Sequence, residues 1–153
     1  MANIKQEYNT AGTATITLAS LANGSGRAMT AVDNSTNKFI SADIRVKVKT
    51  GASGVSSTGY VSVYLVRSED GTNFDDSFGG TDAAFTQQNA ILLGVMSTVA
   101  NATTYQKTFD TNELGITLPA KWSIAVVNNS GAALDSTAGN HSVTYREKYL
   151  TAN

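Results

Sequence analysis

The sequence predicts an all-β protein, an antiparallel β-sandwich or jelly roll of about eight strands. Two observations lead to this fold class. Apolar and polar residues alternate with a period of two in most long segments, which indicates strands with one face in a core. Clusters rich in Gly, Asn and Ser separate these segments, and such clusters supply the turns that antiparallel strands require.

Residues 40–50, "ISADIRVKVKT", show the alternation most clearly. Ile44, Val46 and Val48 fall on one face, and charged side chains fall on the other. Trp122 and Val143 begin similar apolar rows in later segments, so we expect them in the core. The other segments that alternate in this way are 12–20, 59–68, 121–129 and 141–150.

Two segments between the alternating ones give different signals. Residues 90–99, "AILLGVMSTV", form a nearly continuous apolar run, which predicts a strand buried on both faces. Residues 82–90, "DAAFTQQNA", predict a single helical turn with Asp82 as its N-cap.

The chain has 153 residues, which favours one domain over 1–153, with terminal arms at 1–10 and 150–153. It has no cysteine, so disulfides and zinc–thiolate sites are excluded. Its net charge is −1 and it has no basic field, so we expect no nucleic acid partner. No apolar run approaches the roughly 18 residues of a membrane span, so we expect no membrane partner.

Residues 68–82, "SEDGTNFDDSFGGTD", hold five of the twelve acids in the chain. A calcium-binding EF-hand loop that began at Asp70 would need oxygen ligands where Thr72 and Phe74 stand, and Phe74 has none to offer. Asp70-Gly71 is a strong turn signal at the end of a strand. The favoured interpretation is a solvated turn, and an adventitious calcium site remains the alternative.

No constellation of catalytic residues is apparent. His141 is the only histidine and no G-x-S-x-G motif is present, so a Ser-His-Asp triad is not expected. Adjacent carboxylates at Asp75 and Asp76 point to opposite faces of an extended chain, which does not suit a glycosidase. The sequence therefore predicts a protein that is not an enzyme and that uses no cofactor or metal.

The candidate functional residues are aromatic and apolar. Phe74 and Phe78 lie in the acidic loop, where exposed rings would be contact anchors and buried rings would form a lid on the sandwich. The terminal segments "MANIKQEYNT" and "REKYLTAN", which contain the two arms, carry four side chains that could anchor on a neighbouring subunit: Ile4, Tyr8, Tyr149 and Leu150.

The chain resembles the small jelly-roll capsid cement or decoration proteins of tailed bacteriophages. The resemblance lies in the order of the strand-like segments and in their composition, which is free of Cys, low in charge and rich in Thr, Ser, Ala and Gly. It covers nearly the whole chain and includes no diagnostic motif. It lies in "MANIKQEYNTAGTATITLASLANGSGRAMTAVDNSTNKFISADIRVKVKTG", "GYVSVYLVRSEDGTNF" and "WSIAVVNNSGAALDSTAGNHSVTYREKY".

This resemblance implies a virion protein of the outer capsid surface that is assembled in the host cytoplasm. It implies a homo-oligomer, typically a trimer, that binds the major capsid protein and has no enzymatic role. Two other classes stay open, because fold does not fix function. One is a tail, neck or fibre component of the virion, and the other is a carbohydrate-binding β-sandwich module.

Overall fold

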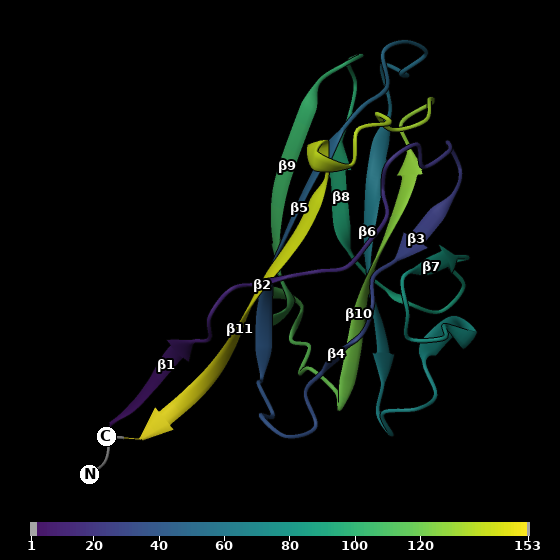
Figure 1. Cartoon of the computed structure of the whole chain (residues 1–153). Helices are drawn as coiled ribbons and strands as arrows, with labels where there is room; N and C mark the ends of the chain where they lie inside the picture. The colour runs from purple at the N-terminus through teal and green to yellow at the C-terminus, as the bar shows by residue number, and fades with distance from the viewer. Residues whose placement is uncertain (1–2, 153) are drawn as a thin grey trace.

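Two antiparallel β-sheets packed face to face make up the computed structural model, which describes residues 3–152 (Figure 1). Three short 3-10 helices interrupt the loops: η1 (Asp75–Ser77), η2 (Thr111–Leu114) and η3 (Ala138–Asn140). The strands of the described residues are β1 (Ile4–Tyr8), β2 (Gly12–Thr13), β3 (Gly26–Ala28), β4 (Val32–Asp33), β5 (Ser41–Lys49), β6 (Tyr60–Ser68), β7 (Ala83–Phe85), β8 (Ile91–Ser97), β9 (Thr104–Asp110), β10 (Lys121–Asn129) and β11 (Ser142–Ala152).

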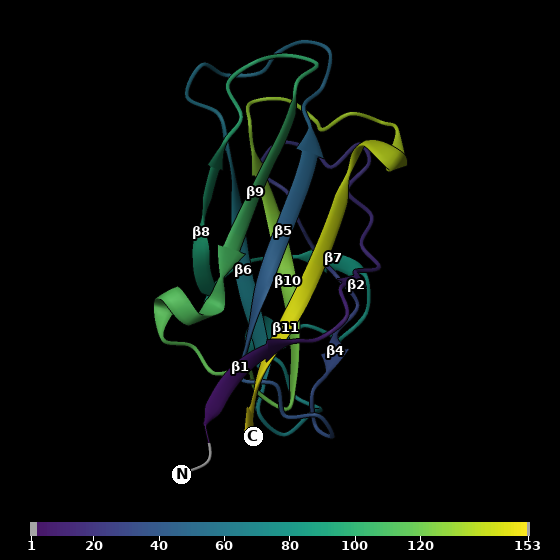
Figure 2. The ribbon, with the colours of Figure 1, turned by 90° about the vertical axis from the view of Figure 1, so that its left-hand side faces the viewer.

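The first sheet, which we call sheet A, has the strand order β1–β11–β5–β9, and β2 also pairs with β11. Figure 2 looks onto this sheet. The second sheet, sheet B, has the order β7–β3–β10–β6–β8, and β4 also pairs with β10. All of these pairings are antiparallel.

The strand order is that of a jelly roll. In sheet A the early strand β2 pairs with the last strand, β11, and in sheet B the early strand β3 pairs with β10. The middle strands follow the same nesting, because β5 pairs with β9 and β6 pairs with β8. Nested pairing of this kind, divided over two sheets, defines the fold. The predicted fold class is confirmed.

The core lies between the two sheets and is built from the alternating positions. Ile44, Val46 and Val48 of β5 are fully buried, and so is Trp122 of β10. The Trp122 ring meets the Tyr145 ring edge-to-face at a centroid distance of 5.1 Å. Burial of apolar area at about 25 cal/mol per Å² is the main stabilising contribution of such a core.

The predicted helical turn over residues 82–90 is wrong. Residues 83–85 form strand β7, which pairs with β3 at the edge of sheet B. The Asp82 side chain does not cap a helix, because it accepts hydrogen bonds from Thr17 and Arg27 instead. Residues 69–90 cross the outer face of sheet B as loops that contain η1 and strand β7, at the lower right of Figure 1.

Among residues 3–152, the only helices are the short 3-10 turns, and none has the length or the apolar character that crossing a membrane requires.

Candidate interaction surfaces

The two predicted arms pair with each other. Strand β1 lies antiparallel to the end of β11, with Ile4 opposite Ala152 and Tyr8 opposite Lys148. All five residues of β1 are exposed. We call residues 4–8 and 148–152 the terminal ribbon, and Figure 1 shows that it projects from the lower left corner of the sandwich.

The terminal ribbon has one outward face that is largely apolar. Residues that pair directly across two strands share a face, so Ile4, Tyr8 and Leu150 lie on the same side. Their exposed fractions are 72%, 46% and 55%. Tyr149 points the other way, packs against the core, and brings its ring within 5.8 Å of the Phe39 ring. Tyr149 therefore holds the ribbon to the sandwich, and the other three residues face solvent.

A buried cation fixes the base of the terminal ribbon. The Lys148 ammonium lies 2.7 Å from a carboxylate oxygen of Asp43 and 2.7 Å from one of Asp110, and its side chain is only 5% exposed. Burial alone would lower the pKa of Lys148, but the hydrogen bonds to Asp110 and Asp43 outweigh it and raise that pKa. The Tyr8 ring covers this group and the neighbouring Arg146, whose guanidinium carbon lies 4.8 Å from the ring centroid.

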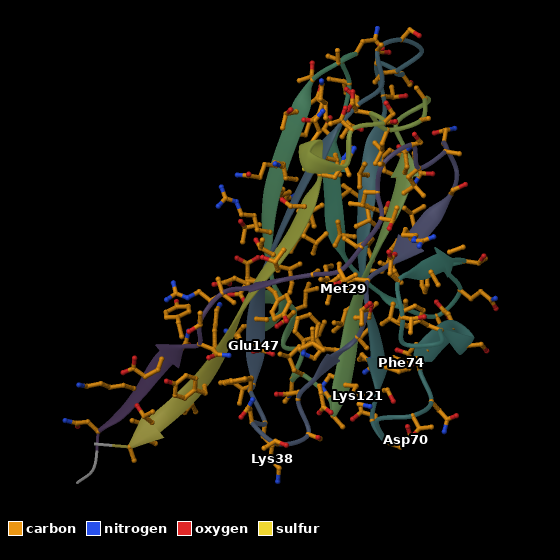
Figure 3. All side chains as sticks on the ribbon, viewed as in Figure 1. Met29, Lys38, Asp70, Phe74, Lys121 and Glu147 are labelled. Carbon is orange, nitrogen blue, oxygen red and sulfur yellow. The ribbon has the colours of Figure 1, made fainter. Side chains whose placement is uncertain are left out.

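Glu147, which directly precedes Lys148 in β11, points into the sandwich (Figure 3). Its side chain is almost completely buried, and one carboxylate oxygen accepts a hydrogen bond of 3.0 Å from the Asn9 amide. The other oxygen, Oε1, has no hydrogen-bond partner among residues 3–152. Burial raises the pKa of the Glu147 carboxyl, and the bond from Asn9 opposes the rise without cancelling it.

The aromatic residues of the acidic loop form a lid on sheet B. Phe78 is 7% exposed, and its ring meets the Phe85 ring at 6.5 Å and the Phe74 ring at 5.5 Å. These rings cover Val66 and Ala125 on the outer face of the sheet. Phe74 is half-buried. Of the two roles left open by the sequence, the structure shows the lid, so Phe78 in particular presents no exposed anchor to a neighbour.

Four of the five acids hold this lid in place. Asp70 accepts hydrogen bonds from the backbone N–H groups of Asn73 and Thr72 at 2.7 and 2.8 Å, which lower its pKa and close the turn shown in Figure 3. Asp76 accepts from the backbone N–H groups of residues 88–90 at 2.6–3.0 Å. Burial works to raise the pKa of Asp76, but these bonds outweigh it and lower the pKa.

The other two of these four acids, Asp75 and Asp82, form ion pairs with arginines of sheet B. Asp75 lies 3.2 Å from the Arg67 guanidinium, and Asp82 lies 2.6 Å from that of Arg27. Within the part of the chain that the structure describes, no three Asp, Glu or His side chains gather where they could hold a metal ion. The hydrogen bonds and ion pairs of these four carboxylates close a turn and clamp the loop to sheet B.

Backbone groups engage both ring nitrogens of His141. Its Nδ1 accepts a hydrogen bond of 3.3 Å from the Lys49 backbone N–H, and its Nε2 lies 2.9 Å from the Asp135 carbonyl oxygen. Because Nδ1 accepts, Nε2 carries the proton and donates it to the carbonyl. The ring therefore joins the last turn to β5.

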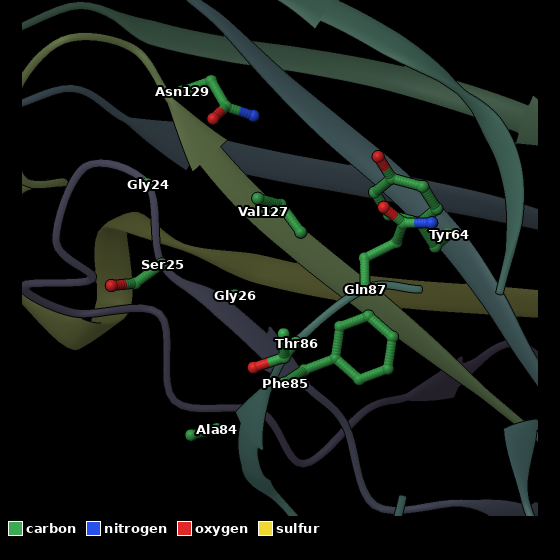
Figure 4. A pocket seen from close by; sticks show the side chains of 10 residues that line it. All are labelled: Gly24, Ser25, Gly26, Tyr64, Ala84, Phe85, Thr86, Gln87, Val127 and Asn129. Atoms are coloured by element: carbon green, nitrogen blue, oxygen red, sulfur yellow. The ribbon is translucent and has the colours of Figure 1, made fainter. Parts of the chain in front are cut away.

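Among the described residues, no segment covers the outer face of sheet B beside the first half of β6 and the second half of β8. The sequence analysis did not predict this open surface. A groove of about 510 Å³ runs along β6 and β8 there. It adjoins a second hollow of about 500 Å³, where Figure 4 shows the rings of Tyr64 and Phe85 at one end and Asn129 at the other. The exposed apolar residues of the first groove are Tyr60, Leu92, Val95 and Val99.

The prediction that residues 90–99 form a strand buried on both faces is wrong in one respect. Strand β8 forms there, and Met96 points into the core, but Leu92 and Val95 are nearly half exposed on the outer side. β8 is an edge strand, and the lid ends before it reaches this part of the sheet. The continuous apolar run in residues 90–99 could have indicated the groove. It places apolar side chains on the outer face of β8, and no other part of the described chain covers them.

Comparisons with known proteins give no family. No family model matches the chain, and no curated protein matches it in sequence. Several solved structures resemble it weakly. The Eiger TNF from S. frugiperda matches 72% of this chain at 13% identity with a TM-score of 0.39, and the match covers 60% of that chain.

Two further structures match more of the chain. The cysteine protease and lectin-like domains of Cwp84, a surface layer associated protein of Clostridium difficile, match 94% of this chain at 18% identity with a TM-score of 0.39. This match spans 30% of the Cwp84 chain. Tomato aspermy virus matches 96% of this chain at 12% identity with a TM-score of 0.29, over 76% of its own chain. The sheet topology, rather than these similarities, establishes the jelly-roll fold.

Proposed function

We propose that the protein is a non-enzymatic structural protein of a tailed-phage virion. It acts as a capsid cement or decoration protein on the outer surface of the head, where it binds neighbouring subunits of the major capsid protein. It assembles in the host cytoplasm, binds as a homo-oligomer, with a trimer as the expected order, and uses no cofactor.

The observation that carries this proposal is the terminal ribbon. A two-stranded extension that projects from a jelly roll, with Ile4, Tyr8 and Leu150 exposed on one face, has the form of an arm that reaches another molecule. Weak contacts of this kind become strong in sum when many copies bind a repeating lattice. The ion pairs of Lys148 with Asp43 and Asp110 also fix the base of the ribbon. The ribbon therefore loses little conformational freedom when it binds a partner.

The rest of the chemistry supports a structural role. Four of the five carboxylates of the acidic loop are occupied by backbone groups and arginines, and His141 is bonded to backbone on both sides. These polar groups serve the fold.

The experiment is an association assay on purified particles that lack the protein. The wild-type chain should bind the heads in hundreds of copies, counted by quantitative mass spectrometry and located by electron microscopy. A chain without residues 1–9 should fold but bind more weakly. A handful of copies at one vertex or on the tail would overturn the cement role in favour of a neck, tail or fibre component, and no binding to particles would overturn the virion role.

A further inference from the structure

Two separate apolar surfaces of this chain are left uncovered. Among the described residues, eight large hydrophobic side chains are substantially exposed, and seven of them fall into two groups. Three lie on the terminal ribbon and four lie in the groove along β6 and β8; Leu114 of η2 is the eighth. Concentration of exposed apolar residues in two places marks two interaction sites, because scattered single residues are what an ordinary surface shows.

The groove is uncharged as well as apolar. It is lined by Ser, Thr, Gly, Tyr, Leu and Val, and no Lys, Arg, Asp or Glu lines it. The outer face of sheet A, in contrast, is charged, because Arg45, Asp43 and Lys148 lie there. A partner that suits the groove must therefore present an apolar surface without charges, since a charge buried there would have no counter-ion.

The tip of the terminal ribbon presents such a surface, whereas Lys148 lies on the same face at the base, where the Tyr8 ring covers it. Near its tip, Ile4 pairs with Ala152 and Gln6 pairs with Leu150, and these four side chains share the outward face. The charged residues Lys5 and Glu7 alternate onto the opposite face. A two-stranded ribbon of five residues is about 17 Å long with strands about 4.8 Å apart, which suits an elongated groove that follows two strands.

Within one chain these two surfaces cannot meet. The groove lies on the outer side of sheet B near the start of β6. The terminal ribbon leaves the far end of sheet A, as Figures 1 and 2 show. We propose that the terminal ribbon of one copy docks, by its outward face, into the sheet B groove of a second copy. The interface is head-to-tail, with Ile4 and Leu150 placed against Leu92 and Val95.

A head-to-tail interface has a definite consequence for assembly. Each copy offers one ribbon and one groove, so the contact repeats, and it closes into a ring if the rotation between copies allows it. The same contact completes the burial of β8, whose outer side is apolar and open in the single chain. This inference concerns copies of this chain alone. It assigns the outward face of the ribbon to a second copy, so a docked ribbon does not offer that face to the capsid, and the test without capsid separates the two proposals.

The test measures oligomeric state in solution, with no capsid present. Light scattering after gel filtration should show the wild-type chain as an oligomer. A ribbon variant with Ile4→Glu and Leu150→Glu, and a groove variant with Leu92→Glu and Val95→Glu, should each be monomeric. Gln106→Glu with Thr108→Glu adds the same two charges to the exposed edge strand β9 of sheet A and should leave the oligomer unchanged. Circular dichroism establishes that each variant is folded.

Mixing the two monomeric variants is the decisive step. The ribbon variant keeps an intact groove and the groove variant keeps an intact ribbon, so an equimolar mixture should form a one-to-one heterodimer. A mixture that stays monomeric would overturn the proposal, and so would a ribbon variant that still forms the wild-type oligomer. A wild-type chain that is monomeric up to about 1 mM, where an interface with a dissociation constant of about 1 mM is already substantially occupied, would also overturn it.

Discussion

Asp76 and Ala90 lie 14 residues apart in the segment that covers sheet B, and the Asp76 carboxylate accepts a hydrogen bond of 3.0 Å from the Ala90 backbone N–H. The same carboxylate binds the N–H groups of residues 88 and 89. One side chain therefore closes the lid onto itself just before β8 begins.

Replacing Asp76 by Asn should loosen this lid. Asn tolerates the left-handed backbone of this position (φ 57°) and has nearly the same volume, but it has one acceptor oxygen where Asp has two. We expect a loss of about 1–2 kcal/mol in the free energy of unfolding, measured with denaturant. Protease cleavage within residues 70–90 should become faster. Glu69→Gln, at an exposed position of the same loop, is the control and should change neither measurement.

The pH dependence of the Asp76 effect has a definite sign. Because the folded protein lowers the pKa of Asp76, its contribution is present above the ordinary pKa of Asp and is lost as the pH falls through the folded pKa. The stability difference between wild type and Asp76→Asn should therefore shrink on acidification. A difference that grows as the pH falls would contradict the role assigned to this carboxylate.

Phe78→Ala should be more damaging, because it removes the buried centre of the lid. Phe78 contacts both Phe74 and Phe85, and truncation of a buried phenylalanine leaves a cavity and typically costs about 3–5 kcal/mol. Denaturant unfolding measures this loss, and increased binding of a hydrophobic dye should report exposure of Val66 and Ala125. Phe74→Ala is the matched control, and since Phe74 is half-buried it should cost less. Equal costs would show that Phe78 is not the centre of the lid.

The alternation of apolar residues predicts the central strands well because it has one dominant cause. Ile44, Val46 and Val48 each lose all contact with water, and a shift of one residue would expose them together. The edges of the sheets depend on weaker and non-local factors. Residues 83–85 pair with β3 because Asp82 is held by Arg27, a contact between residues 55 apart in sequence that no local pattern reveals.

The candidate interface could be predicted only in part for the same reason. Ile4, Tyr8 and Leu150 stand out in the sequence as apolar residues in terminal segments, and the structure exposes them. The pairing of the two termini into one ribbon joins the extreme ends of the chain, so no local signal predicts it. The roles of Tyr149 and Phe78 follow from which face each occupies, and in a short strand or a loop the sequence does not determine this face.

Glu147→Gln should stabilise the protein at neutral pH. The folded state raises the pKa of this carboxyl, so the folded protein holds its proton more tightly than the unfolded chain does. Stability is then greatest below the ordinary pKa of Glu and falls as the pH rises through the folded pKa. Gln retains an oxygen for the Asn9 amide and carries no charge.

The measurement is the midpoint of thermal unfolding as a function of pH. The gain in midpoint for Glu147→Gln should be largest at pH 7, should shrink as the pH falls through the folded pKa of Glu147, and should vanish below the ordinary pKa of Glu. Glu113→Gln, at an exposed position of η2, serves as the comparison and should show no such gain. A constant gain at every pH would mean that charge burial is not its cause.

Lys148→Met should destabilise the sandwich and free the terminal ribbon. Methionine fills a similar volume, but it leaves the Asp43 and Asp110 carboxylates side by side without the cation that lies 2.7 Å from each. Loss of one partner from a buried ion pair costs about 3–5 kcal/mol, and because these carboxylates keep some contact with solvent we expect about 2–4 kcal/mol. Hydrogen exchange at residues 4–8 should become faster, since β1 pairs with this part of β11.

The control for Lys148 is Lys47→Met, because the Lys47 ammonium has only one exposed bond, of 3.3 Å, to the Gly139 carbonyl oxygen. This change should cost little, since exposed interactions of this kind contribute about 0–1 kcal/mol. The folded state raises the pKa of Lys148, so its contribution is fully present below the ordinary pKa of Lys and is lost as the pH rises through the folded pKa. The difference between wild type and Lys148→Met should therefore be constant near neutral pH and decline only in strongly alkaline solution. A decline that begins near neutral pH would show that another titrating group, and not this ammonium, fixes the base of the ribbon.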